Sequence, residues 1–168
     1  MKLFKTLLLL ACLCLCLAPA SGALAGGFYL NPSVGAAIPT EGDNSPSIGL
    51  GLDVGYEFTS WLAGGVSYRY LHDTGREELE STHLYDVNAT LFKRLVVVTP
   101  YVRAGVGAYT MTFEHEDSNT DPLFNIGAGI GLHPIPFIGL TAGVTYHLLA
   151  DSVDFFEPMI TFGFSLGK

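Results

Sequence analysis

The chain has 168 residues, enough for a single domain, with 49% hydrophobic residues and a formal net charge of −8. This acidity argues against nucleic acid as a partner, because Lys and Arg are needed to bind phosphates. A chain that is both acidic and apolar must keep the two kinds of residue apart, and the sequence shows where it does so.

The N-terminal residues have the features of a secretory signal. Lys2 and Lys5 give a short positive region, and an apolar run follows at 7–17. A helix that spans a bilayer needs about 20 apolar residues, so this run is too short for a comfortable membrane anchor. We therefore predict that the segment is an export signal.

A cleavage site follows the apolar run. Ala23 and Ala25 form the small-x-small pattern that signal peptidase reads. We predict a signal peptide over residues 1–25, cleavage before Gly26, and one mature domain over residues 26–168.

The cysteines allow a second interpretation of the N-terminus. All three of them, Cys12, Cys14 and Cys16, lie inside the predicted signal. The stretch Leu9 to Cys12 loosely resembles a lipoprotein box, in which Cys12 would carry the lipid. With cleavage after Ala25, the mature protein has no cysteine, which excludes disulfides and thiolate metal sites.

From Gly27 onward, apolar residues recur at every second position, which is the pattern of β-strands. The clearest segment alternates Ile48, Leu50 and Leu52 with glycine and aspartate. The predicted strands cover residues 27–38, 48–58, 61–72, 82–93, 98–112, 124–132, 138–148 and 160–166.

The links between these strands alternate in length and charge. The links after the first, third, fifth and seventh strands are long and hold twelve of the sixteen acidic residues. The links after the second and sixth are tight, and the link after the fourth carries Lys93 and Arg94. Long loops at one end and short turns at the other are typical of outer-membrane barrels. Without Lys2 and Lys5, six basic and sixteen acidic residues remain, a formal charge of −10.

The volume of the apolar side chains indicates which face of the strands points outward. The interior of an eight-stranded barrel barely accommodates side chains, so the large apolar face does not fit inside. The opposite face is rich in glycine with scattered polar residues, which suits a narrow polar lumen. We predict an all-β fold, an eight-stranded antiparallel up-and-down transmembrane β-barrel. Aromatic residues near both strand ends, among them Tyr101 toward the turns and Phe155 toward the loops, predict two interfacial girdles.

Three stretches carry a resemblance to a known family: 51–58, 66–71 and 100–109. Each resembles a strand of the OmpA/OmpX-like outer-membrane β-barrels. The resemblance implies an outer-membrane location, contact with lipid and lipopolysaccharide, and insertion by the barrel-assembly machinery. Family members usually end on an aromatic residue, whereas this chain ends on Lys168. We expect a monomer without cofactor.

Charged residues on the predicted inner face suggest how the lumen is filled. Buried charges must pair and form hydrogen bonds, or their burial costs too much. We predict a buried network that plugs the lumen, as the resemblance also implies; the alternative is a narrow solute channel or gated pore. The predicted network consists of Asp53, Glu57, Arg69, Asp86 and Arg103, with Asn88 beside it.

A lipid-modifying enzyme is a further alternative. Some small outer-membrane barrels are lipid A deacylases that use a lipid-facing His, Ser and Glu, and here His147, Ser152 and Glu157 lie near one another in sequence. His147 falls on the inward phase, however, and Leu149 stands where the serine would be expected. We therefore predict no catalytic site.

The acidic residues at 114–121 raise the question of a divalent cation. The segment lacks the glycine and the distant glutamate of an EF-hand loop. A solvated loop is the favoured interpretation, and no metal site is predicted; cations that bridge these carboxylates to lipopolysaccharide phosphates are the alternative.

Overall fold

The computed structural model describes residues 26–40, 45–72, 79–113, 118–135, 137–150 and 152–166. The predicted signal peptide over 1–25, with Cys12 and its cleavage site after Ala25, lies outside these residues. Most of the acidic loop residues and Lys168 also lie outside them.

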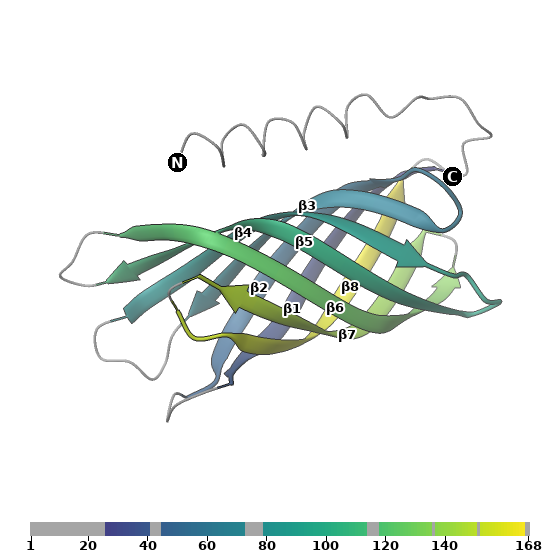
Figure 1. Ribbon diagram of the computed structural model, residues 1–168. Coiled ribbons are helices and arrows are strands. Elements are labelled where there is room, and N and C mark those ends of the chain that lie inside the picture. The colour runs from purple at the N-terminus through teal and green to yellow at the C-terminus, as the bar shows by residue number, and fades with distance from the viewer. Residues whose placement is uncertain are drawn as a thin grey trace.

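The described residues form eight antiparallel strands that close into a barrel (Figure 1). Each strand pairs with its neighbours in sequence, and β1 closes the ring by pairing with β8. The predicted fold class is thereby confirmed. The strands are β1 (Phe28–Pro39), β2 (Ser47–Glu57), β3 (Leu62–His72), β4 (Leu79–Phe92), β5 (Val98–Phe113), β6 (Asn119–Ile135), β7 (Ile138–Leu149) and β8 (Phe155–Leu166).

Two strands are clearly longer than the sequence pattern predicts. β6 begins at Asn119 and β8 at Phe155, five residues before each predicted start. β4 also begins three residues early, at Leu79, so that Glu80 and Asp121, predicted in loops, lie in β4 and β6. The ladders therefore continue beyond the apolar stretch of each strand, where water can solvate charged side chains.

The two ends of the barrel differ in their links. The links β2–β3, β4–β5 and β6–β7 lie at the same end as the C-terminus (Figure 1). We call this the turn end, and the opposite end, which carries the acidic links, the loop end. The β2–β3 turn is held by bonds from the N–H groups of Phe58 and Thr59 to the carbonyl of Leu62.

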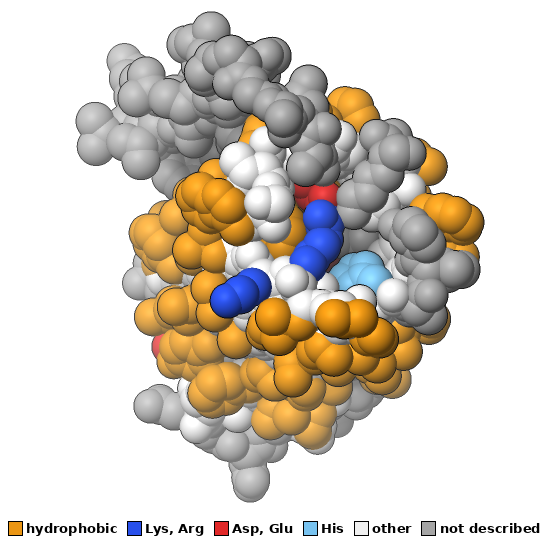
Figure 2. Space-filling view, turned by 90° about the vertical axis from the view of Figure 1, so that its right-hand side faces the viewer, with side chains coloured by type: hydrophobic (Ala, Val, Ile, Leu, Met, Phe, Trp, Pro, Cys, Tyr) orange, Lys and Arg blue, Asp and Glu red, His pale blue; other side chains and the backbone are white. Residues whose placement is uncertain are grey.

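The outer wall of the barrel is apolar. Large aliphatic side chains on alternate positions are exposed, with Leu50 at 58%, Ile126 at 59% and Ile160 at 49%. Apolar side chains also surround the barrel at its turn end (Figure 2). No helix among the described residues is long and apolar enough to cross a membrane. Such a wall suits hydrocarbon, where a closed barrel satisfies its backbone hydrogen bonds internally.

Aromatic side chains gather at both ends of this wall. Phe28 and Tyr56 pack edge to face at the turn end, and Tyr68 packs on Tyr85 toward the loop end. Two residues predicted for these girdles point into the lumen instead. Tyr101 and Phe155 lie on the inward phase of β5 and β8, and Phe155 is only 5% exposed.

Candidate functional site: the barrel lumen

The centre of the lumen holds a network of alternating charges. Asp53, Ser67 and Asp86 share one register row across β2, β3 and β4. Arg69, two residues along β3 from Ser67, places its Nη2 3.0 Å from Asp53 Oδ2. Arg103 on β5 places Nη1 3.2 Å from Asp53 Oδ1 and Nη2 3.5 Å from Asp86 Oδ1. The structure thus brings four of the five predicted residues together.

Neutral polar groups add hydrogen bonds to these ions. Ser67 donates a hydrogen bond to Asp86 at 2.9 Å and accepts one from Arg103 at 2.9 Å. Asn88 donates to Ser67 at 2.7 Å and to Asp86 at 3.2 Å. These bonds satisfy groups that would otherwise lose water without compensation. The sequence pattern pointed to Asn88 but Ser67 was not singled out. Its position in the alternation of the strand, between the outward Val66 and Tyr68, would have indicated that it faces the lumen.

The network extends to the far wall through residues that the sequence reasoning did not assign to it. Glu157 on β8 lies with Oε2 3.6 Å from Arg69 Nε and 3.0 Å from His147 Nε2 on β7. Both side chains are almost fully buried. The chain of contacts therefore crosses the lumen from β4 to β7. The predicted last strand began at Ile160, so the sequence pattern did not indicate whether Glu157 faces the lumen or the lipid.

Glu57 is the exception among the predicted network residues. It lies at the turn end of β2, where both of its carboxylate oxygens are 2.6 Å from Arg94 Nη2. Arg94 comes from the β4–β5 turn and also lies 5.0 Å over the ring of Phe92. Among the contacts described, this ion pair belongs to the mouth of the barrel and is separate from the central network.

Glycine gives the central guanidinium its room. A Cβ at Gly51 would overlap the side chains of Arg69 and Ser33. Gly51 and Arg69 are register partners on β2 and β3, so the arginine folds over its neighbouring strand. The glycines of the inner face thus admit large polar side chains into a narrow lumen.

The loop side of the lumen is apolar, in contrast to the polar lumen that the sequence predicts. Seven buried residues pack there in one cluster, with Met111 against them. Leu123 and Leu84 are 0% and 1% exposed. The alternation of the strands assigned apolar residues to the lipid face. It did not predict that the inward positions near the loops are apolar too. The cluster consists of Ala37, Leu71, Leu84, Tyr109, Leu123, Leu149 and Phe155.

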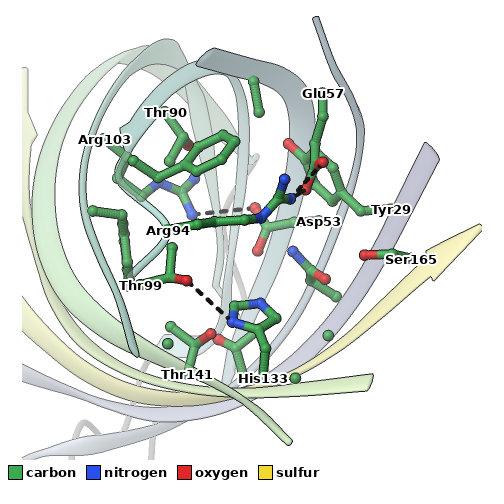
Figure 3. A pocket seen from close by; sticks show the side chains of 18 of the residues that line it. Tyr29, Asp53, Glu57, Thr90, Arg94, Thr99, Arg103, His133, Thr141 and Ser165 are labelled. Carbon is green, nitrogen blue, oxygen red and sulfur yellow. Dashed lines mark hydrogen bonds and ion pairs between the residues drawn. The ribbon is translucent and has the colours of Figure 1, made fainter. Parts of the chain in front are cut away.

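The turn side of the lumen is a polar cavity of about 140 Å³, here called the vestibule (Figure 3). Arg103 and Asp53 form its floor, and Thr99, hydrogen-bonded to His133 at 3.3 Å, lies on its wall. Arg94 and Glu57 lie at its mouth, where Figure 2 shows basic and acidic side chains side by side. The vestibule ends at the charge network.

The residues considered for catalysis do not assemble on the lipid face. The His147 ring lies inside the lumen, 4.6 Å from the Phe155 ring and bonded to Glu157. Ser152, in the link between β7 and β8, has Met111 Sδ as its hydrogen-bond partner at 4.0 Å. Among the described residues, no group of three or more His, Cys, Asp or Glu could hold a metal ion. The acidic residues at 114–117 lie outside the described part.

Solved structures with the same architecture come from several outer-membrane proteins. Neisserial surface protein A has a TM-score of 0.71 at 15% identity, over 87% of this chain and 100% of that one. Ail, the attachment invasion locus protein of Yersinia pestis, solved with the heparin analogue sucrose octasulfate, has a TM-score of 0.62 at 19% identity. That match covers 84% of this chain and 97% of Ail.

The outer membrane enzyme PagL matches as well, with a TM-score of 0.54 at 15% identity over 82% of this chain and 99% of that one. At such identities the likeness shows the fold alone. No curated protein sequence matches the chain. Residues 7–166 match the model of the outer membrane protein beta-barrel domain. The chain therefore belongs to this family and is a small outer-membrane β-barrel protein.

Proposed function

We propose that this protein is a closed barrel with a structural or surface-interaction role, and that it conducts no solutes. The observation that carries the proposal is the filling of its lumen by two successive layers. Ion pairs link β2, β3, β4, β5 and β8 in the middle of the barrel. The apolar cluster then fills the loop side. An aqueous path would have to cross both layers.

Each layer opposes ions for a different reason. Arg69 and Arg103 hold their carboxylates through direct contacts, and separating them would leave buried charges without partners. Leu84 and Leu123 offer no polar atom to a dehydrating ion. A gated pore would require both layers to rearrange together, which is why we favour the closed barrel.

Conductance in planar lipid bilayers tests this proposal. The purified protein is expected to insert into the bilayer without producing a steady current at positive or negative voltage. A variant with Leu84→Ala, Leu123→Ala and Arg103→Ala removes part of both layers and is expected to give a leak. Reproducible, voltage-proportional current steps from the unaltered protein would establish the pore instead.

The enzymatic alternative has the likeness to PagL in its favour and the side-chain geometry against it. A lipid A deacylase of the kind considered needs its histidine on the lipid face. Here His147 is 2% exposed and points into the lumen. We therefore propose that the protein is not an enzyme.

Charge indicates the kind of surface partner. Ail was solved with a sulfated polyanion, whereas twelve of the sixteen acidic residues here fall in or next to the loop-end links. Like charges repel a polyanion, so a cationic partner, or divalent cations that bridge to lipopolysaccharide phosphates, fits better. The protein is expected to pass through immobilised heparin at low salt. Retention that salt reverses would contradict this part of the proposal.

A further inference from the structure

The vestibule offers hydrogen-bonding groups that the protein itself does not use. None of six inward-facing hydroxyls there forms a hydrogen bond with another described residue. Hydroxyls of this kind both donate and accept, so they must be satisfied by water or by a ligand. They belong to Tyr29, Thr90, Tyr101, Thr141, Thr161 and Ser165.

The charges that border the vestibule are already neutralised. Arg103 pairs with Asp53 and Asp86 on the floor, and Arg94 pairs with Glu57 at the mouth. A charged ligand would have to displace one of these partners. A neutral ligand only has to exchange hydrogen bonds with water, so the electrostatics favour a neutral one.

Two tyrosines give the vestibule aromatic walls. Tyr29 on β1 lies over the register partners Gly55 and Gly65 of β2 and β3, which leave its ring the space of two side chains. Tyr101 on β5 lies in the same way over Gly129 and Gly143 of β6 and β7. Because β1 and β5 are four strands apart in a ring of eight, the two rings belong to opposite walls.

The volume limits the size of the ligand. The cavity of about 140 Å³ has room for several water molecules, which a ligand would displace. We propose that the vestibule binds a small neutral polyol, no larger than one sugar ring, from the turn side of the membrane. Aromatic faces and unpaired hydroxyls are the groups that recognise the C–H and O–H faces of such a molecule.

Entry requires only a small movement. The Arg94 side chain is 34% exposed, and its ion pair with Glu57 spans the mouth. Exposed ion pairs of this kind contribute little to stability, so the pair opens at small cost. The binding groups further inside lie on paired strands and keep their positions.

Solution NMR of the full-length mature chain in detergent micelles tests the proposal, with glucose as the probe. The ring signals of Tyr29 and Tyr101 are expected to shift and to saturate as glucose is added. Sucrose, which is twice as large, is expected to shift them far less. Thr141 and Thr161 are register partners on β7 and β8. The double variant Thr141→Val, Thr161→Val keeps the shape and is expected to weaken glucose binding about tenfold.

A matched control separates binding from general effects of the substitutions. Thr110 and Thr120 are register partners on the outer wall of β5 and β6, hydrogen-bonded at 2.9 Å. The double variant Thr110→Val, Thr120→Val is expected to bind glucose as the unaltered protein does. Shifts that grow linearly without saturation, or equal weakening in both double variants, would overturn the proposal and leave the vestibule as a water-filled cavity.

Discussion

Replacing Arg69 by methionine is expected to lower the free energy of unfolding by about 3–5 kcal/mol, because it leaves Asp53 and Glu157 as buried charges without their shared cation. Methionine keeps most of the side-chain volume, so the loss measures charge more than packing. Urea unfolding in lipid vesicles, followed by the fluorescence of Trp61, the one tryptophan of the chain, gives the value.

The matched control is Arg94→Met. Arg94 also pairs with a glutamate, but at the exposed mouth, where such pairs contribute about 0–1 kcal/mol. Adding Asp53→Asn and Glu157→Gln to Arg69→Met is expected to restore much of the lost stability, since both carboxylates are then neutral and Arg103 keeps its pair with Asp86. Equal losses from Arg69→Met and Arg94→Met would show that the central network does not carry the stability assigned to it.

Replacing Gly107 by alanine is expected to cost about 3 kcal/mol, the upper end of what overpacking costs. A Cβ at Gly107 would overlap the carbonyl oxygen of Tyr85 and come within 2.7 Å of the Cα of Asp86. Both are backbone atoms of the paired strand β4 and cannot rotate away. The fraction that migrates as folded barrel on an unheated detergent gel measures the effect.

Gly163→Ala provides the comparison for Gly107→Ala. It also faces the lumen, but the nearest atom to its Cβ would be the side-chain oxygen of Asn31 at 3.3 Å, which can move. We expect Gly163→Ala to change stability by less than about 1 kcal/mol. A barrel that tolerates both substitutions equally would mean that β4 and β5 approach each other less closely at Gly107.

The fold could be predicted from the alternation of apolar and polar residues, because every strand of the barrel has one face toward lipid and one toward the lumen. Leu50, Leu52 and Val54 face hydrocarbon, and Gly51 and Asp53 face the lumen, so the alternation itself indicates the two faces. The same alternation placed Asp53, Arg69, Asp86 and Arg103 inside. It could not place Glu57, because the height of a residue along the barrel depends on strand tilt and register, which local sequence does not contain.

Two parts of the lumen could not be predicted from the sequence: the contact between Glu157 and His147, and the apolar cluster. Glu157 and His147 meet because Thr145 and Glu157 are register partners, a relation between two strands that neither strand shows alone. The apolar cluster was missed for a different reason. Leu84 and Leu123 point inward among many outward leucines, and hydrophobicity does not distinguish a residue that faces lipid from one that faces a dry interior.

Accessibility of single cysteines tests the closed lumen most directly, because all three native cysteines lie in the predicted signal peptide and the mature chain provides a blank background. The variants are Ser45→Cys at the exposed loop end, Leu84→Cys in the apolar cluster, Ser67→Cys in the charge network and Thr141→Cys in the vestibule. A membrane-impermeant maleimide added to intact cells is expected to label Ser45→Cys alone, and permeabilising the outer membrane is expected to add Thr141→Cys. Labelling of Ser67→Cys or Thr141→Cys in intact cells at the rate of Ser45→Cys would contradict the closed lumen. The reagent would then have passed through the apolar cluster to reach position 67, and through both layers to reach position 141.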